Sequence, residues 1–405
     1  MIPICTVDEA TDLMLGAARD FGTEDLPLQE TVGRILREKL IADRDFPPFD
    51  RIAMDGIAIR YAAWEQGRST FRITGIQGAG APPQQLPSAE ACIEVMTGSV
   101  LPLGADTVVP YEQLQISGKQ ARVAPQPAIR PKQHVHPKGE DRRQGDVLVS
   151  PGHRLAAADI GLAATVGKAS LRVSRMPRTA VVSTGDELVP IGTAPADYQI
   201  RISNAPALQA AFLPLGLRGD IYHLPDDRRE TLLFLRNMLA KYELLVLTGG
   251  ISRGKYDFVP TTLADAGVLP ALTGVRQRPG KPLWFGQSET TTVFGLPGNP
   301  VSALLGAHRY VLPWLRACLG LRPFPGLKVQ LDTEVPTPKE ATYFLPVVLT
   351  DDKEGKEKAR HRPGKGSGDL ANLALVSGFL EIPPEMAKAE AGGWYRYFPV
   401  RPRWP

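Results

Sequence analysis

The stretch Leu244-Leu-Val-Leu-Thr-Gly-Gly-Ile-Ser-Arg-Gly-Lys-Tyr-Asp257 decides how the chain is interpreted. Its apolar run, Leu244 to Leu247, predicts a strand that is buried on both faces of a parallel sheet. Gly249 and Gly250 end the run, and paired glycines let backbone N–H groups approach a ligand closely. A strand, a glycine turn and the start of a helix favour an anion site, with a plain tight turn as the alternative.

This stretch belongs to a region in which strands and helices alternate from residue 178 onward. We predict strands at 179–182, 217–223, 243–247 and 291–294, with amphipathic helices between them. This alternation is typical of a parallel sheet flanked by helices, in which ligands bind beyond the carboxyl ends of the strands. Four loops are therefore expected at one edge: Ser183–Glu187, Pro225–Asp227, Gly249–Asp257 and Gly295–Pro300.

The rest of the chain predicts two further kinds of structure. Thr6 and Glu9 form a capping box that starts an amphipathic helix, and an alanine-rich helix is expected at 156–166. Short β-prone runs separated by Gly and Pro fill residues 70–150 and return at 326–405. We therefore predict an N-terminal helical framework with an inserted β lobe, then the α/β domain, then a C-terminal β domain.

Composition excludes several classes of protein. The three cysteines are odd in number and widely spaced, which argues against a disulfide framework and against a cysteine zinc site. The net charge of +4 does not indicate a nucleic-acid partner. The most apolar long segment, 301–319, contains His308, Arg309 and Arg316 and is interpreted as a core helix, so no membrane association is expected. A reducing, cytoplasmic location fits this composition.

The presumed sheet edge combines acids with basic residues. The acids are Asp186, Glu187, Asp226, Asp227 and Asp257, and the basic residues are Lys255, Arg278 and Lys281. Carboxylates beside phosphate-cradling turns favour Mg²⁺, whereas each acid taken singly is also a plausible helix cap. The turn Pro279-Gly-Lys-Pro282 would hold one lysine rigidly against an oxyanion.

No nucleophile with a neighbouring base stands out, so metal-assisted chemistry on a phosphorylated or nucleotide-bearing ligand is the predicted class. His134 and His136 would share a strand face. The basic residues around them favour a phosphate-contacting or solvated loop over a metal site.

Six motifs together resemble the MoeA family of molybdopterin molybdenumtransferases, which also includes the E domain of gephyrin. They are Pro47-Pro-Phe-Asp-Arg-Ile-Ala-Met-Asp-Gly56, Ser183-Thr-Gly-Asp-Glu-Leu188, Ser203-Asn204, Thr248–Asp257, Pro279–Pro282 and Leu296-Pro-Gly-Asn-Pro300. The resemblance implies four domains: 1–40 with 150–175 as the helical framework, 41–149 as the inserted β lobe, 176–325 as a MoaB/Mog-like three-layer α/β domain, and 326–405 as a small β-barrel. It also implies a homodimer whose site is shared between subunits.

The same resemblance implies Mg²⁺-dependent insertion of molybdate into adenylylated molybdopterin, with release of AMP. The functional acids would be Asp55, Asp141, Glu187, Asp226 and Asp257, and the Mg²⁺ ligands would come from Asp186, Glu187, Asp226 and Asp257. Substrate-binding positions would be Thr184, Gly185, Asp186, Ser203, Asn204, Gly249, Gly250, Ser252, Gly254, Lys281, Pro282, Pro297, Gly298, Asn299, Pro300, Ser302 and Ser367. A molybdopterin adenylyltransferase and a molybdoenzyme or its chaperone would be the protein partners.

The chain departs from the family pattern at three places. Lys255 stands where an acid is common, Arg278 replaces a lysine before the Pro-Gly-Lys-Pro turn, and Phe344 is followed by Leu345 instead of a basic residue. Two alternatives therefore stay open. One is a divergent paralogue that acts as an adenylyltransferase or a nucleotide pyrophosphatase, and the other is a non-catalytic binding scaffold.

Overall fold

The computed structural model describes residues 4–126, 128–252, 257–321, 326–352 and 354–401. The chain forms two compact units, and each is described by itself. The first unit consists of Met1–Arg37, Pro151–Ala157 and Ser170–Pro405, and the second of Glu38–Ser150 and Ala158–Ala169.

A six-stranded sheet forms the centre of the first unit. Its order is β16 (Gly219–Leu224), β13 (Thr179–Thr184), β17 (Leu244–Thr248), β21 (Thr292–Leu296), β20 (Trp284–Gln287) and β18 (Leu269–Leu272). The first four strands run parallel, as predicted, and every residue of β17 is buried. Strand β20 is antiparallel to both of its neighbours, β21 and β18, which the sequence did not reveal.

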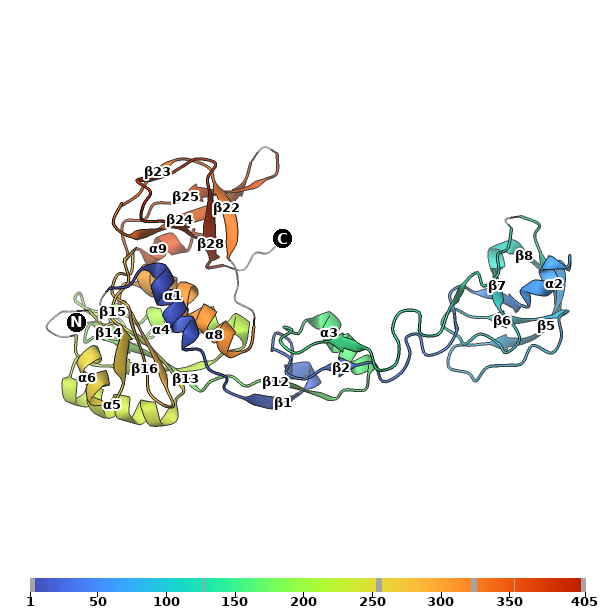
Figure 1. The fold of residues 1–405 in the computed structure, drawn as a ribbon, viewed down its shortest axis with the longest axis horizontal. Coiled ribbons are helices and arrows are strands. Elements are labelled where there is room, and N and C mark those ends of the chain that lie inside the picture. Colours follow the sequence, from blue (N-terminus) through green and yellow to red (C-terminus); the bar gives the residue numbers. More distant parts are fainter. Residues whose placement is uncertain (1–3, 127, 253–256, 322–325, 353, 402–405) are drawn as a thin grey trace. The chain divides into compact units, whose positions relative to one another are not determined.

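Helices cover both faces of this sheet and make it the middle of three layers (Figure 1). Helices α5 (Arg228–Lys241) and α6 (Val259–Asp265) pack on the face that carries Val182 and Leu247. The opposite face, with Val181 and Val246, packs against α1 (Val7–Gly16), α4 (Asn204–Phe212), α7 (Pro300–Gly306) and α8 (Leu312–Cys318). Alternate residues of one strand thus serve two cores, which explains the continuous apolar run.

A π-helical segment, η4 (Ala307–Val311), joins α7 to α8. The chain at 301–319 is therefore a core helix, as expected, and no helix of the described residues is long and apolar enough to span a membrane. Helix α1 starts at the predicted capping box, in which Thr6 and Glu9 bond each other's backbone N–H. Within the first unit, β1 (Thr23–Pro27) pairs with β12 (Ser170–Ser174), and η1 (Leu28–Glu30) follows β1.

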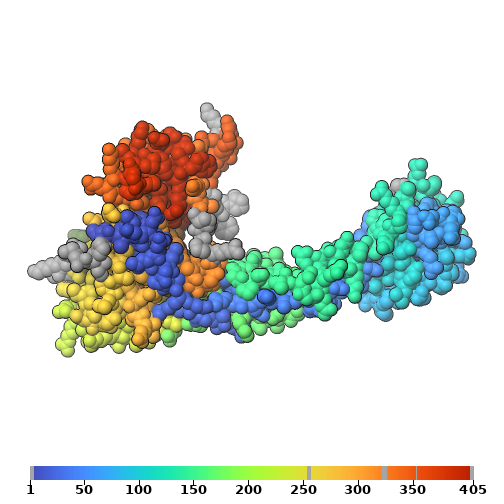
Figure 2. Space-filling view, viewed as in Figure 1, coloured from blue at the N-terminus to red at the C-terminus, as the bar shows by residue number. Residues whose placement is uncertain are grey.

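The C-terminal region forms the predicted small barrel, drawn in red in Figure 2. Its strands are β22 (Leu327–Leu331), β24 (Thr342–Asp351), β25 (Glu357–His361), β26 (Gly378–Ile382) and β28 (Trp394–Pro399). Strand β24 pairs with both β25 and β26, which closes the ring, and β19 (Gln277–Arg278) adds to β24 in parallel. The short elements α9 (Leu370–Leu373), β23 (Val335–Pro336) and β27 (Lys388–Ala389) complete this region.

The second unit contains the β lobe. Its sheet has the order β7 (Thr107–Pro110), β4 (Gly56–Ile59), β6 (Ala91–Val95), β5 (Thr70–Gln77), β9 (Gln120–Val123) and β8 (Leu114–Ser117). Strand β11 (Val147–Val149), within the β-prone stretch 70–150, pairs with β2 (Leu40–Ile41) outside this sheet. Strand β3 (Arg51–Ile52) pairs with β10 (Val135–His136), while α2 (Tyr61–Glu65), η2 (Tyr111–Gln113) and α3 (Ala157–Thr165) are the unit's helices.

Candidate functional site

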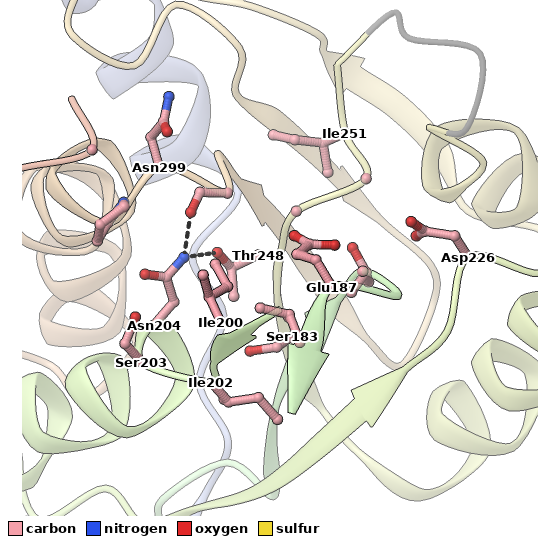
Figure 3. A pocket seen from close by; sticks show the side chains of 18 of the residues that line it. Ser183, Glu187, Ile200, Ile202, Ser203, Asn204, Asp226, Thr248, Ile251 and Asn299 are labelled. Atoms are coloured by element: carbon pink, nitrogen blue, oxygen red, sulfur yellow. Dashed lines mark hydrogen bonds between the residues drawn. The ribbon is translucent and has the colours of Figure 1, made fainter. Parts of the chain in front are cut away.

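All four predicted loops meet in one pocket of about 640 Å³ at the carboxyl edge of the parallel strands (Figure 3). The pocket is lined from these loops by Thr184, Gly185, Glu187, Asp226, Gly249, Gly250, Ser252, Asp257, Gly298, Asn299 and Pro300. Ser203 and Asn204, at the start of α4, also line it. The convergence follows from the fold, because the carboxyl ends of parallel neighbours lie at one edge.

The glycine turn after β17 adopts a left-handed backbone conformation that favours glycine. Gly249 has φ +95° and Gly250 has φ +63°, a region that side chains rarely adopt. A Cβ at Gly249 would stand 2.7 Å from the carbonyl oxygen of Thr184. The turn thus crosses the end of β13 at a distance that only glycine permits.

Asn204 ties three parts of the pocket wall together. Its Nδ2 donates to Thr248 Oγ1 over 2.9 Å and to the Gly298 carbonyl over 2.7 Å (Figure 3). Thr248 Oγ1 in turn donates to the Pro297 carbonyl over 2.9 Å. Asn204 and Thr248 therefore fix the loops after β17 and β21, and this part of their role is structural.

The two neighbouring acids after β16 divide their roles. Asp227 caps α5, since its carboxylate accepts the Glu230 N–H over 2.8 Å. Asp226 instead lines the pocket, and its own N–H donates to Asp186 Oδ1 over 3.0 Å. The helix-cap interpretation therefore holds for Asp227 and fails for Asp226.

Asp226 carries the electrostatic signature of a binding site. Its pKa is raised above the ordinary value, first by burial and then by the charges of Asp186, Glu187 and Asp257. Like charges held together in a pocket favour a cation that would separate them. Among the described residues no three His, Cys, Asp or Glu side chains are placed to hold a metal alone, so ligand oxygens would have to complete such a site.

Thr184 was a predicted position, but the sequence did not indicate two features of this pocket: the unsatisfied hydroxyls at the end of β13 and the side chain of Arg201. Ser183 Oγ and Thr184 Oγ1 are buried without a hydrogen-bond partner, which marks unused polar capacity at the end of β13. Arg201 is the single basic side chain among the described residues that line the pocket, and its Nε donates to the Thr193 carbonyl over 3.0 Å. Arg201 lies two residues before the Ser203-Asn204 motif, and this proximity in the sequence could have indicated that it belongs to the site.

A second pocket, of about 760 Å³, lies where the α/β sheet meets the barrel. Of the predicted positions, Lys281, Pro282, Pro297, Ser302 and Ser367 line it, and Ser252, Gly298 and Asn299 line both pockets. Arg278 and Lys365 add positive charge, while burial lowers the pKa of His361. Phe344 lines this pocket, and Leu345 beside it is buried in the barrel core.

The remaining predicted acids lie in the second unit. Asp55 Oδ1 accepts both the N–H and the hydroxyl of Thr97 at 2.6 Å, and these bonds lower its pKa. Asp141 Oδ1 lies 3.2 Å from Nε2 of His136, which also approaches Glu140. Gly254 and Lys255 lie outside the described residues.

Comparison with known proteins supports this architecture over nearly the whole chain. The model of the MoeA N-terminal region (domain I and II) matches residues 5–167, a probable molybdopterin binding domain matches 180–317, and the MoeA C-terminal region (domain IV) matches 328–397. The molybdopterin molybdenumtransferase of Synechocystis sp. is 36% identical over 396 residues, 97% of this chain and 99% of the relative. The protein of that name from Haemophilus influenzae is 32% identical and covers 78% of each chain.

Solved structures agree. The molybdopterin biosynthesis moeA protein of Pyrococcus horikoshii OT3 matches with a TM-score of 0.83 and 26% identity, over 98% of this chain and 100% of its own. The fold and the relatives thus define a transferase of molybdenum cofactor biosynthesis. Within that class, the chain belongs to the MoeA family of molybdopterin molybdenumtransferases.

Proposed function

We propose that this chain inserts molybdate into adenylylated molybdopterin and releases AMP, with Mg²⁺ as cofactor. One observation carries the proposal: a mainly acidic pocket and a mainly basic pocket share the wall of Ser252, Gly298 and Asn299. Acids outnumber Arg201 in the first pocket, and basic residues outnumber Asp369 in the second. The acidic pocket suits a Mg²⁺-bound phosphoanhydride, and the basic pocket suits a tetrahedral dianion. The two pockets adjoin at these residues, so the two ligands that must react would meet there.

The acidic pocket fits Mg²⁺ in the form that this ion usually takes. Mg²⁺ binds through one or two carboxylates and keeps substrate phosphate oxygens and water as its other ligands. Asp226 is held close enough to Asp186, Glu187 and Asp257 for its pKa to rise, and one or two of these four acids would hold the ion. The bound ion would offset phosphate charge as the anhydride breaks.

The chemistry needs no protein nucleophile. As molybdate exchanges one oxo ligand for the dithiolene, two Mo–S bonds form, and the two thiol protons leave with the oxo oxygen as water. A water molecule splits the phosphoanhydride between AMP and the pterin phosphate. The chain's residues would hold the reactants, with the Lys281 ammonium, Ser302 and Ser367 on the oxyanion and the Gly249–Gly250 turn on the phosphates.

Two parts of the proposal concern assembly. The chain would act as a homodimer, with Asp55 and Asp141 of each subunit completing the site of the other. A molybdopterin adenylyltransferase would supply the substrate, and a molybdoenzyme or its chaperone would accept the product.

The test is a direct assay of the purified protein with adenylylated molybdopterin, molybdate and Mg²⁺. We expect AMP and molybdenum-loaded cofactor in equal amounts, and their loss in Asp257→Asn with the fold intact. If neither product forms with any divalent metal, the proposal is wrong. Pyrophosphate release from ATP and unmodified molybdopterin would point instead to an adenylyltransferase, and binding of the pterin without any turnover would favour a scaffold. Full activity in both Asp55→Asn and Asp257→Asn would show that these acids are not catalytic.

A further inference from the structure

The buried side chain of Gln277 occupies the inner side of the turn that carries Lys281. It is 3% exposed, and its Nε2 donates to the carbonyl oxygens of Pro279 and Gly280 over 3.1 and 3.2 Å. The turn is closed at its ends by a bond from the Val275 N–H to the Lys281 carbonyl of 3.0 Å. The loop is therefore built around the Gln277 carboxamide.

Tyr310 sets the orientation of that carboxamide. Its hydroxyl donates to Gln277 Oε1, and its side chain is 2% exposed. If the carboxamide were rotated by half a turn, its oxygen would face two carbonyl oxygens, which is repulsive. The Tyr310 hydroxyl and the two carbonyls thus all favour the same orientation of the Gln277 carboxamide. A buried hydrogen-bond network in which every group is satisfied is rigid.

Tyr310 is itself fixed on both sides. It lies in the π-helical segment Ala307–Val311, where Arg309 stacks on its ring at 5.2 Å and on Phe398 at 5.0 Å. Arg309 Nε donates to Glu381 Oε2 of the barrel over 2.7 Å. One helical segment therefore anchors both the Lys281 turn and the barrel strand β26 that lies beyond it.

The consequence concerns backbone donors. In a trans peptide the C=O and N–H groups point in opposite directions. Because Gln277 draws the Pro279 and Gly280 carbonyls inward, the N–H groups of Gly280 and Lys281 point away from it. Among the described residues neither N–H donates to a protein acceptor. Gly280 has φ +86°, and a Cβ there would stand 2.9 Å from Gln277 Nε2, so the turn cannot shift to another shape without losing these contacts.

We infer that Gln277, held by Tyr310, is the positioning residue of an oxyanion cradle formed by the Gly280 and Lys281 N–H groups together with the Lys281 ammonium. This inference rests on the proposed function, because it names the residues that would orient the molybdate-binding turn. The ligand class is a tetrahedral dianion. Preorganised donors of this kind act strongly because they need no rearrangement when charge arrives.

Tyr310→Phe is the decisive variant, since it removes one hydroxyl and leaves the packing in place. We expect the half-saturating molybdate concentration to rise about tenfold. This is the loss of affinity that corresponds to the loss of one hydrogen bond. The half-saturating concentration of the pterin substrate should not change. Gln277→Glu keeps the shape of the side chain but places an oxygen against two carbonyls. It should weaken the binding of molybdate by roughly a hundredfold.

Tyr395→Phe is the matched control, because it removes a buried hydroxyl that accepts the Glu390 N–H in the barrel, away from both pockets. It should leave both half-saturating concentrations unchanged. The inference is overturned if Tyr310→Phe and Gln277→Glu bind molybdate as the unsubstituted chain does. It is also overturned if both variants lose affinity for the pterin substrate to the same extent as for molybdate. If the unsubstituted chain itself neither binds molybdate in calorimetry nor inserts it, the proposed function fails first, and that result is distinct.

Discussion

The main-chain N–H of Asp226 donates to the carboxylate of Asp186 over 3.0 Å, so acids from two different loops of the sheet edge are held together. The Asp226 carboxyl in this position costs the protein stability at neutral pH, because burial and the charges of the neighbouring acids raise its pKa. Such an arrangement is typical of a site that awaits a cation.

Asp226→Asn should separate function from stability. A carboxyl whose pKa is raised on folding contributes stability below its unfolded value near 3.8, and this contribution is lost as the pH rises through the folded value. At pH 7.5 the Asn variant should therefore melt at the same or a higher temperature, with the difference vanishing below pH 4. Insertion activity should fall to background. A variant that melts lower at pH 7.5, or that inserts molybdate normally, would contradict this account.

Asp227→Ala should do the opposite. Loss of the N-cap of α5 should reduce the free energy of unfolding by about 1 kcal/mol, measured by denaturant unfolding. Because Asp227 does not line the pocket, insertion at a temperature below unfolding should be unchanged. Asp227→Ser, which can still cap the helix, is the control and should recover most of the stability. If the unsubstituted chain, Asp227→Ala and Asp227→Ser are equally stable, the cap does not contribute to the free energy of unfolding.

Gly249→Ala should damage the pocket more than the fold. The new Cβ would require a left-handed conformation that costs about 1–2 kcal/mol, and it would press on the Thr184 carbonyl at 2.7 Å. The turn must then move, so the pterin substrate should bind at least tenfold more weakly in an equilibrium binding assay. Gly192→Ala, at an exposed turn with open space, is the control and should bind normally. Normal binding by Gly249→Ala would show that the turn is not in contact with the substrate.

The ion pair of Glu243 with Arg175 should make the free energy of unfolding decrease in acid. Arg175 holds Glu243 through two bonds of 2.9 and 2.8 Å, and together with the Arg178 N–H it lowers the pKa of Glu243 to about 2. A carboxyl whose pKa is lowered on folding stabilises the protein above its unfolded value near 4.5, and this stability is lost as the pH falls toward 2. In Glu243→Gln the denaturant midpoint of unfolding should therefore depend less on pH between pH 4.5 and 2 than it does in the unsubstituted chain. Glu289→Gln, at an exposed position, should keep the slope of the unsubstituted chain.

The sequence predicts best what depends on local pattern. The buried strand Leu244–Thr248 forms as expected because its residues serve a core on each face. The pocket at the sheet edge could be predicted because parallel strands place their following loops together. The α/β domain, the inserted β lobe and the closed barrel are confirmed in this way. The division into four domains at the stated residues stays a prediction.

What could not be predicted depends on contacts between distant residues. The antiparallel strands β18 and β20 lack the period that identifies a central strand, and only their partners define them. Gln277 gave no signal, because its role depends on Tyr310, which is 33 residues away. Which of Asp226 and Asp227 caps the helix was equally open, since both residues are good caps and only the backbone geometry decides.

The wall of Ser252, Gly298 and Asn299, which faces both pockets, has a thermodynamic consequence. Two ligands that touch the same three residues cannot be bound independently unless that wall is perfectly rigid. Whatever factor molybdate applies to the affinity of the pterin, the pterin must apply to the affinity of molybdate, because the coupling free energy of a closed cycle is reciprocal. A substitution at Gly298 would alter that single factor and would therefore be detected equally from either ligand.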